Sequence, residues 1–330
     1  MKPVVLVTGG AGYIGSHVCR ALAHAGFSPV VYDSLIYGKP ERVQWGPLVQ
    51  GDIRDRAALD AAFQTHKPVA VMHFAALISV GESVSQPLET YDVNFLGSFN
   101  LCQAMRAHGV NTLVFSSTAA VYGTPKVVPI VEDAPKMPIN PYGASKWAVE
   151  GLLDDLTTGL GWKTAALRYF NAAGALPDDG LGYIREKPLH LIPIALQAIL
   201  GVRPPLDIYG TDYPTPDGTA VRDYIHVADL ADAHVLALQA LLQGTSRLRL
   251  NLGTSRGYSV REILEACQDA TGTPVPTREA PRRAGDPASL IADASAAQRA
   301  LGWSPSRSGI STIIADDWSW HQRHFQSQRA

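Results

Sequence analysis

The chain has 330 residues, of which 46% are hydrophobic and 18% are charged, and its formal net charge at pH 7 is −2. This composition is that of a globular protein with a sizeable core in one large or two modest domains. The near-neutral charge gives no reason to expect a nucleic acid or an anionic membrane as a partner.

The three cysteines, Cys19, Cys102 and Cys267, are far apart and form no CxxC group. This spacing argues against a disulfide framework and against a zinc site, so we expect no bound metal. The apolar run at the N-terminus stops at Gly9, too soon for a signal peptide, and no run approaches the ~18 apolar residues that span a bilayer. We therefore expect a soluble protein in the reducing cytoplasm.

The first predicted element is a strand over residues 4–7, whose uniformly apolar sequence is typical of a strand buried on both faces of a parallel sheet. Gly9, Gly12 and Gly15 follow at three-residue intervals, ahead of a helix expected to begin near Tyr13. A glycine turn before a helix N-terminus lets backbone N–H groups approach a pyrophosphate. The glycine spacing alone leaves open a tight turn without a ligand.

A second strand over residues 29–32 ends in Asp33. An acid at this position can accept hydrogen bonds from both ribose hydroxyls of NAD and would repel the 2′-phosphate of NADP. The predicted cofactor is therefore NAD. After a third short strand comes Asp52, which could form an Asx-turn. A fourth strand over residues 69–73 ends in His73, interpreted as a structural hydrogen-bonding group.

Residues 112–118 indicate a buried strand that carries hydroxyls at its C-terminal end, where ligands bind in open parallel sheets. On a helix predicted from Tyr142 to about Thr158, Tyr142 and Lys146 are four residues apart and share a face. An ammonium group close to a phenol favours the phenolate and lowers its pKa from ~10. This spacing alone is common, but its combination with a hydroxyl strand and a glycine turn is far more specific.

From Asn171 onward, stretches rich in glycine and proline over residues 171–190 and 203–218 alternate with short elements. We therefore expect an α/β fold with a doubly wound parallel sheet of the Rossmann type and a smaller C-terminal substrate-binding lobe. The predicted boundary assigns residues 1–170 to the NAD-binding domain and residues 171–330 mainly to the lobe, with some elements returning to the Rossmann domain.

Two local predictions complete this outline. The proline-rich residues 123–141 lie between two candidate catalytic segments and are predicted to form an ordered active-site loop. Asp229 is predicted to be the N-cap of a helix that extends to about Leu242.

The combination of glycine turn, hydroxyl strand, tyrosine and lysine resembles the short-chain dehydrogenase/reductase superfamily, in its extended, sugar-nucleotide-modifying branch. Segments along almost the whole chain further resemble the UDP-glucose 4-epimerase family; these segments are Phe74-Ala75, Val80-Gly81-Glu82-Ser83, Arg168-Tyr169-Phe170-Asn171, Arg222-Asp223-Tyr224-Ile225-His226-Val227 and Pro281-Arg282-Arg283-Ala284-Gly285-Asp286. The resemblance implies reversible interconversion of UDP-galactose and UDP-glucose through a 4-keto intermediate, with bound NAD. It also implies a role in galactose metabolism and a homodimer.

The resemblance implies a catalytic role for three residues: Tyr142 takes the proton from O4, Lys146 favours the phenolate, and Thr118 hydrogen-bonds O4. The implied cofactor-binding residues are Gly9, Gly12, Tyr13, Ile14, Gly15, Asp33, Asp52, Ile53, Phe74, Ala75, Asn94, Ser116, Tyr142, Lys146 and Tyr169. The implied substrate-binding residues are Thr118, Tyr142, Asn171, His190, Leu191, Leu206, Tyr209, Arg222, Arg283, Asp286 and Leu290.

Among the substrate-binding residues, Arg222 and Arg283 are expected to anchor the diphosphate, because guanidinium groups match phosphate oxygens. Tyr209 would stack on uracil, and Asp286 would bind a hydroxyl of the sugar nucleotide. Leu290 corresponds to the position that limits space for a 2-N-acetyl group.

Three residues depart from the commonest pattern of the family. Thr118 stands where serine is frequent and keeps the hydroxyl, whereas Ile78 stands where a lysine that contacts the cofactor is frequent. His190 replaces an asparagine, which could make diphosphate binding depend on pH.

Two other functions remain open at this stage besides epimerases of other UDP-sugars. A 4,6-dehydratase of the same branch usually carries Asp-Glu beside the central hydroxyl, where this chain has Ala119-Ala120. A non-catalytic NAD-binding protein with the same fold is the second alternative.

Overall fold

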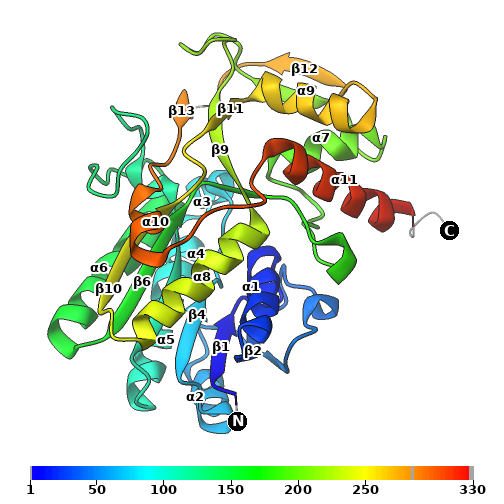
Figure 1. Ribbon diagram of the computed structural model, residues 1–330. Helices are drawn as coiled ribbons and strands as arrows, with labels where there is room; N and C mark the ends of the chain where they lie inside the picture. The colour runs from blue at the N-terminus through cyan, green and yellow to red at the C-terminus, as the bar shows by residue number, and fades with distance from the viewer. Residues whose placement is uncertain (1, 284–285, 327–330) are drawn as a thin grey trace.

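The computed structural model describes residues 2–283 and 286–326, which form a large lobe and a smaller lobe (Figure 1). Ala284 and Gly285, which belong to one of the family-like segments, lie outside the described residues. The large lobe is built on one sheet that, in the described chain, has seven strands in the order β10 (Arg247–Leu252), β6 (Lys163–Tyr169), β5 (Thr112–Thr118), β4 (Ala70–His73), β1 (Val4–Thr8), β2 (Ser28–Asp33) and β3 (Leu48–Gln50).

All neighbouring strands of this sheet are parallel. The chain starts at β1 and builds outward first through β2 and β3, then through β4, β5, β6 and β10 on the other side. This order is that of a doubly wound Rossmann-type sheet, with the switch of direction between β1 and β4. The predicted fold class is therefore confirmed.

Alternate residues of the central strand serve two separate cores. Val5 and Val7 belong to a core with α1 (Tyr13–His24) and α8 (Val227–Leu242), whereas Leu6 belongs to a second core on the opposite face. This alternation follows from the two-residue period of a strand. The second core is covered by α2 (Arg56–His66), α5 (Gly97–Ala107) and α6 (Pro141–Leu160). Because both faces are covered, the strands are apolar throughout.

Short helical segments lie between the strands and the longer helices. These are η1 (Pro40–Arg42), α3 (Val80–Ser85), α4 (Pro87–Tyr91), the π-helical turn η2 (Asp92–Leu96), η3 (Ala119–Tyr122) and η4 (Pro177–Asp179). In the described part of the chain, no helix is both long and apolar enough to cross a bilayer.

The smaller lobe is centred on β9 (Val221–His226). This strand pairs with β7 (Asn171–Ala173), β11 (Gly257–Ser259) and β13 (Ser289–Leu290). A separate parallel pair joins β8 (Leu206–Tyr209) to β12 (Thr277–Ala280). Helices of this lobe share a third core; they are α7 (Leu191–Ile199), α9 (Val260–Thr271) and α11 (Ile310–Gln326).

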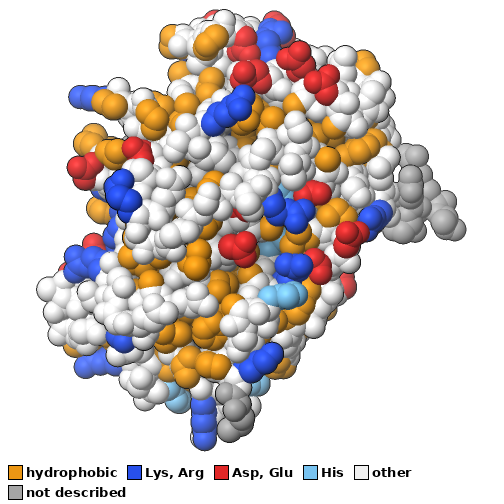
Figure 2. Space-filling model, viewed as in Figure 1, with side chains coloured by type: hydrophobic (Ala, Val, Ile, Leu, Met, Phe, Trp, Pro, Cys, Tyr) orange, Lys and Arg blue, Asp and Glu red, His pale blue; other side chains and the backbone are white. Residues whose placement is uncertain are grey.

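Elements from the second half of the chain also belong to the large lobe. Strand β10 forms the edge of the large sheet, and α8 and α10 (Ser295–Leu301) pack on its face (Figure 1). Acidic and basic side chains are interspersed over the face seen in Figure 2. One such pair is formed by Arg307 and Asp316 near the junction of the lobes. Nη2 of Arg307 lies 2.9 Å from Oδ2 of Asp316.

The prediction that Asp229 caps α8 is wrong. The cap is His226, whose Nδ1 accepts a hydrogen bond from the backbone N–H of Ala228 (3.0 Å). The buried carboxylate of Asp229 instead accepts hydrogen bonds from the backbone N–H groups of Ser306 (3.1 Å) and Arg307 (2.8 Å). A short-range pattern could not show these partners, because they are nearly eighty residues away in the sequence.

The proline-rich loop is ordered, but it does not line a cavity. The buried Ile130 anchors it: the backbone of Ile130 donates to Ile291 and accepts from Asp293, both at 2.8 Å. Residues 123–140, all of which are described, lie outside the lining of both cavities considered below. The loop thus joins the large sheet to the segment around β13, and its role as an active-site loop stays a prediction.

Candidate active site

Two adjoining cavities lie between the lobes. The first, of about 440 Å³, is formed where the C-terminal ends of β1, β2, β4, β5 and β6 meet; the second, of about 620 Å³, extends along β8, β9 and the start of α7. Both volumes are in the range of small-molecule sites. Asn171, His190 and Arg222 line both cavities, so a long ligand can extend from one into the other.

The glycine turn forms the floor of the first cavity, and its shape requires glycine. Gly9 has φ +74°, and a Cβ on Gly15 would lie 2.3 Å from the carbonyl oxygen of Gly9. Gly12 is the N-cap of α1, so no side chain of the cap residue bonds the backbone N–H groups of the first turn. The first-turn residues Tyr13 and Ile14 line the cavity, where free backbone N–H groups and the helix dipole favour an anion.

Two carboxylates lie on the wall beyond the turn. Asp33 is buried, and its oxygens accept backbone hydrogen bonds from Ala11 (3.0 Å) and Leu35 (2.8 Å), which fix its orientation. Burial raises the pKa of Asp33, and these backbone hydrogen bonds oppose that shift. Asp52 accepts from the backbone N–H of Arg54 (2.8 Å), so the Asx-turn is present and Asp52 lines the cavity as well.

Tyr142 and Thr118 face the same cavity from α6 and from the end of β5. Helix α6 begins where it was expected, because the side chain of Asn140 accepts a hydrogen bond from the backbone N–H of Gly143 (2.8 Å). Burial raises the pKa of the Tyr142 phenol, and a hydrogen bond with Thr118 opposes the shift. The expected lowering of the Tyr142 pKa by Lys146 is not found in the protein alone.

Lys146 lies behind the cavity wall and is only 2% exposed. Its Nζ donates a hydrogen bond to the carbonyl oxygen of Ser116 (2.9 Å) and lies 4.7 Å from the centre of the Phe115 ring. Burial lowers the pKa of Lys146 to about 7. The lysine is therefore close to the point at which it can hold or release a proton at neutral pH.

Of the other predicted cofactor residues, some line the cavity, whereas Asn94 supports a residue that does. Ser116 and Tyr169 line the cavity and are hydrogen-bonded to each other through their hydroxyls. Asn94, in contrast, is buried behind the wall, where its amide binds both the N–H (2.8 Å) and the carbonyl (3.0 Å) of Leu77. Asn94 thus positions Leu77, which lines the cavity, and a contact between Asn94 and the cofactor stays a prediction.

A buried ion pair supports the segments that carry these side chains. Glu150 on α6 and Arg168 on β6 are 0% and 3% exposed, and their side chains form a bidentate pair with a shortest distance of 2.6 Å. The hydroxyl of Ser117 also donates to Glu150. Since Ser117 lies between Ser116 and Thr118, the pair connects α6, β5 and β6 at the level of the site.

His73 has the structural role that was expected. It is buried, its Nδ1 lies 2.6 Å from the hydroxyl of Thr8, and its Nε2 lies 2.8 Å from the hydroxyl of Ser98. The Ser98 hydroxyl donates to the carbonyl of Asn94, so Nε2 of His73 donates to it and Nδ1 accepts from Thr8. Burial lowers the pKa of His73 to about 3, which keeps the ring neutral.

The candidate diphosphate anchors have protein partners in the second cavity. Arg222 forms an ion pair with Asp286, and the guanidinium carbon of Arg283 lies 3.8 Å from the centre of the Tyr209 ring. The face of Tyr209 expected to stack on uracil is therefore in contact with Arg283. The carboxylate of Asp286, expected to accept a hydrogen bond from a hydroxyl of the sugar nucleotide, is likewise paired with Arg222.

His190 lies at the junction of the two cavities. Burial, together with the nearby charge of Arg185, lowers its pKa to about 4. The ring is therefore neutral at physiological pH in the protein alone, and a pH-dependent contact between His190 and a diphosphate stays a prediction.

The structure brings most of the predicted site residues together around the two cavities. Those lining the first are Gly9, Gly12, Tyr13, Ile14, Gly15, Asp33, Asp52, Ile53, Phe74, Ala75, Ser116, Thr118, Tyr142, Tyr169, Asn171, His190, Arg222 and Leu290. Those lining the second include Asn171, His190, Leu191, Leu206, Tyr209, Arg222, Arg283 and Asp286. Ile78 also lines the first cavity.

Sequence reasoning missed several residues that line the first cavity, among them Tyr37, Arg42, Tyr183 and Arg185. Arg42 ends the short helix η1, and the other three come from irregular segments; none of the four belongs to a recognisable motif. The single available signal was the glycine- and proline-rich character of residues 171–190, which marks a loop but does not show where it folds. Among the described residues, no group of three or more His, Cys, Asp or Glu side chains is placed to hold a metal ion.

Comparison with known proteins identifies the family. Residues 5–253 match the NAD dependent epimerase/dehydratase family. The chain belongs to this family. A UDP-glucose 4-epimerase of Rhizobium leguminosarum bv. trifolii is 48% identical over 322 residues, which cover 98% of each chain. One from Azospirillum brasilense is 50% identical over 327 residues, covering 99% of this chain and 94% of its own.

A solved structure shows the same relationship in three dimensions. The UDP-glucose 4-epimerase of Brucella ovis in complex with NAD superposes with a TM-score of 0.94 at 46% identity, covering 98% of each chain. The family resemblance found in the sequence is thereby confirmed.

The first cavity suits the dinucleotide that the family uses. The glycine turn leaves room for a pyrophosphate at the N-terminus of α1, and the fixed carboxylate of Asp33 stands at the end of β2, where it can accept ribose hydroxyls. These features of the cavity agree with the predicted cofactor, NAD.

The low pKa of Lys146 generates a prediction about stability. A lysine whose pKa is lower in the folded than in the unfolded protein destabilises the fold most below its folded pKa, about 7, and the penalty shrinks as pH rises towards the unfolded value. Replacing Lys146 by Met removes the titration. The wild type should therefore gain stability relative to Lys146→Met as pH rises. The free energy of unfolding of the variant minus that of the wild type should fall by about 1–3 kcal/mol between pH 6 and pH 9.

Urea unfolding of both proteins at the two pH values measures this difference. Lys126→Met, at an exposed lysine outside both cavities, is the matched control and should show no such change. A difference between Lys146→Met and the wild type that does not vary with pH would contradict the assignment.

Proposed function

We propose that this protein is a UDP-glucose 4-epimerase, which interconverts UDP-galactose and UDP-glucose through a 4-keto intermediate with bound NAD. The observation that carries the proposal is the placement of Tyr142 and Thr118, linked by a hydrogen bond, in the wall of the cavity that also contains the glycine turn. The adjoining cavity, with Arg222 and Arg283, has the character of a nucleotide-diphosphate site.

The proposed reaction avoids direct inversion of an unactivated carbinol carbon. When bound, NAD accepts hydride from C4 of the hexose and returns it to the opposite face of the planar ketone. Tyr142 takes the O4 proton as the hydride leaves and gives it back when the hydride returns. Thr118 holds O4 by a hydrogen bond, and the positive charge of Lys146 behind the wall favours the phenolate.

A phenol with a raised pKa needs positive charge to act as a base at neutral pH. Burial raises the pKa of Tyr142 in the protein alone. The oxidised nicotinamide ring is cationic, and Lys146 can also bind the adjacent ribose. The phenolate is therefore expected to form in the complete complex, when both charges are close to Tyr142.

Turning the keto sugar over requires that the nucleotide be held more firmly than the sugar. We propose that Arg222 and Arg283 bind the diphosphate, so that Arg222 exchanges its contact with Asp286 and Arg283 its contact with Tyr209. Tyr209 can then stack on uracil. Other contacts are proposed for Asn171, His190, Leu191 and Leu206, and residues 171–330 would thus mainly form the substrate-binding lobe.

The alternative chemistry of a 4,6-dehydratase has less support. That reaction needs an acid and a base beside the central hydroxyl, whereas the cavity wall beside Thr118 is formed by Ala119 and Ala120, which cannot transfer protons. A non-catalytic NAD-binding protein would have no need for a buried lysine, Lys146, one helical turn from Tyr142 on α6. We place the reaction in cytoplasmic galactose metabolism and the supply of sugar nucleotides.

The phenol is tested by Tyr142→Phe. The wild type should convert UDP-galactose to UDP-glucose, with the product identified by NMR, and the variant should lose at least ~10²-fold in turnover because general acid–base catalysis is lost. Binding of NAD and UDP-galactose should persist, since the ring remains. Near-wild-type turnover of the variant would remove Tyr142 from the mechanism.

The choice of sugar is proposed to depend on Leu290. This residue lies opposite Arg222 on β9 and lines the first cavity together with Tyr142 and Thr118, whereas the adjacent Ser289 lies outside the lining. Neighbouring residues of a strand point to opposite faces. A 2-N-acetyl group pressed against leucine should cost about 1–3 kcal/mol of overpacking, or roughly one to two decades in rate.

We therefore expect a higher kcat/KM for UDP-galactose than for UDP-N-acetylgalactosamine, and a smaller difference in Leu290→Ser. Ser289→Ala is the matched control and should leave the ratio unchanged. Equal values for the two substrates in the wild type would rule out a gate at Leu290 and favour an epimerase of broader range, including N-acetylhexosamines or pentoses.

We also propose that the protein is a homodimer. Four large hydrophobic side chains are exposed along the continuous helical stretch from α4 to α5: Leu88 (85%), Tyr91 (39%), Leu96 (44%) and Phe99 (40%). Exposed apolar stripes of this kind mark association surfaces. In a two-fold symmetric dimer, the stripe of one copy would pack against the same stripe of the other copy, so that both are covered.

Leu88→Lys combined with Phe99→Lys should convert the dimer into a monomer, because each copy would place two cations in an apolar interface. Sedimentation velocity measures the change in mass. Val127→Lys, at an exposed residue of the 123–140 loop, is the control and should remain dimeric. A wild-type protein that sediments as a monomer at micromolar concentration would exclude this interface.

A further inference from the structure

Arg185 extends from the smaller lobe across the mouth of the first cavity. Its guanidinium carbon lies 4.2 Å from the centre of the Tyr37 ring, and its Nη2 lies 3.9 Å from a carboxylate oxygen of Glu82. The side chain is 13% exposed, so it is mostly enclosed although it belongs to a loop. Arg185 and Tyr37 both line the first cavity.

The two partners of Arg185 come from opposite sides of the glycine turn. Tyr37 follows β2, and Glu82 lies on α3, which follows β4. In the sheet, β1 lies between β2 and β4, and the glycine turn follows β1. A side chain that contacts both neighbours therefore spans the turn at which a pyrophosphate is expected.

The loop that carries Arg185 is fixed to the large lobe at the preceding residue. Arg42, which is only 3% exposed, donates a hydrogen bond from Nη2 to the carbonyl oxygen of Ile184 (3.4 Å). The ring of Tyr183, two residues before Arg185, packs edge to face against Tyr13 at the start of α1, with 5.4 Å between ring centres. The position of Arg185 is thus set by contacts with the cofactor side of the molecule.

The charge of Arg185 is weakly satisfied by the protein. Across residues 2–283 and 286–326, Glu82 is its one ion-pair partner, at 3.9 Å, and the Glu82 side chain is 54% exposed. Exposed pairs of this kind contribute little. A planar guanidinium with five donors can bind phosphate oxygens in a bidentate manner, which the contact with Glu82 does not achieve.

We propose that Arg185 binds the pyrophosphate of NAD and, stacked on Tyr37, retains the cofactor from the side of the smaller lobe. This inference rests on the proposed function in so far as that function uses bound NAD. The guanidinium would then join the two lobes through the cofactor, and the carboxylate of Glu82 would be displaced by a more highly charged anion.

The test is the rate at which the protein with bound NAD releases it, measured by capturing free NAD with an excess of a second NAD-dependent dehydrogenase. Arg185→Gln should release NAD about tenfold faster or more, the size of one lost charge-assisted contact. Arg185→Lys keeps the charge but loses the planar stack, and its rate should lie between those of the wild type and Arg185→Gln. Tyr37→Ala should release NAD roughly two- to fivefold faster, as expected for one cation–π contact.

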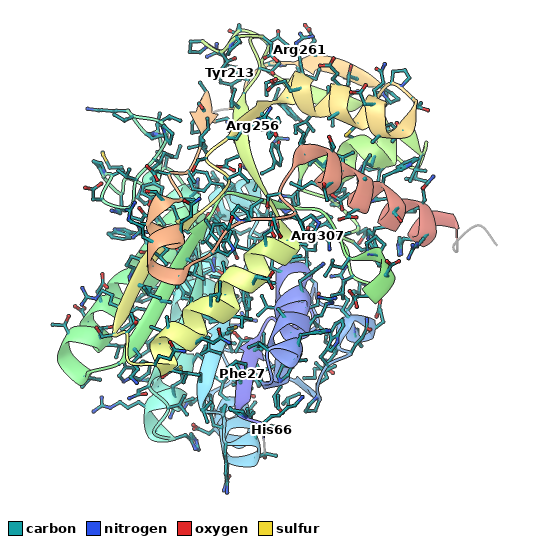
Figure 3. All side chains as sticks on the ribbon, in the orientation of Figure 1. Phe27, His66, Tyr213, Arg256, Arg261 and Arg307 are labelled. Atoms are coloured by element: carbon teal, nitrogen blue, oxygen red, sulfur yellow. The ribbon has the colours of Figure 1, made fainter. Side chains whose placement is uncertain are left out.

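Arg261→Gln is the matched control. Arg261 is on α9, far from the large sheet in Figure 3, and pairs with an exposed glutamate, Glu279. It should release NAD at the wild-type rate. Release from Arg185→Gln at the wild-type rate, or equal acceleration in Arg261→Gln, would overturn the proposal.

Binding to the NAD-free protein separates a phosphate contact from simple closure of the cavity. Arg185→Gln should bind ADP-ribose, which contains the pyrophosphate, about tenfold more weakly than the wild type, and should bind adenosine equally well. Equal weakening of both ligands would overturn the pyrophosphate contact. None of these measurements requires sugar turnover, so failure of the epimerase assay and failure of this inference are distinguishable.

Discussion

The enclosed ion pair between Glu150 and Arg168 joins the three elements on which the candidate catalytic groups depend. Helix α6 carries Tyr142 and Lys146, and it is attached through Glu150 to β5 and β6. Removing one member of such a pair would leave a buried charge without a partner, at a cost of about 3–5 kcal/mol. The pair therefore favours a single register between the helix and the strands, which sets the distance between the phenol and the hydroxyl of Thr118.

The same network reaches the edge of the large sheet. Arg168 also donates to the hydroxyl of Tyr122 (3.0 Å), which donates to the amide oxygen of Asn251 on β10 (2.6 Å). Asn251 in turn donates to the carbonyl of Ile130 in the proline-rich loop (2.8 Å). Through this loop, the position of β13 and of Leu290 is linked to the position of the catalytic helix.

Burial has opposite effects on the two titratable groups of α6. It raises the pKa of Tyr142 and lowers the pKa of Lys146, because in each case the charged form is disfavoured. The protein alone therefore favours a neutral phenol and weakens the lysine as a permanent cation. A cationic nicotinamide would shift this balance towards the phenolate, so in the proposed mechanism proton transfer would depend on occupation of the cofactor site.

Much of the fold and part of the site could be predicted from local sequence. Uniformly apolar strands, the glycine turn and Asp33 indicate a doubly wound sheet with a dinucleotide site, because these features act over a few residues. Tyr142 stood out because its spacing to Lys146 is combined with a strand that carries hydroxyls and with a glycine turn. Such features need no knowledge of distant contacts.

The remainder depends on contacts between distant residues. His226, rather than Asp229, caps α8, because Asp229 binds the backbone near Ser306. Arg185 reaches the first cavity because its loop folds back onto Tyr13 and Arg42. No spacing rule connects such partners. The sequence could therefore predict the chemistry of the site more readily than the loops that fold over the first cavity.

The central claim is that C4 is oxidised and reduced without loss of its hydrogen to solvent. The most direct measurement is conversion of UDP-galactose in D₂O, followed by NMR of the UDP-glucose formed. The account predicts protium at C4, because a hydrogen transferred as hydride is held in a carbon–hydrogen bond, which does not exchange with solvent before the hydrogen returns. Deuterium at C4 would show that the hydrogen leaves as a proton, and would contradict the account.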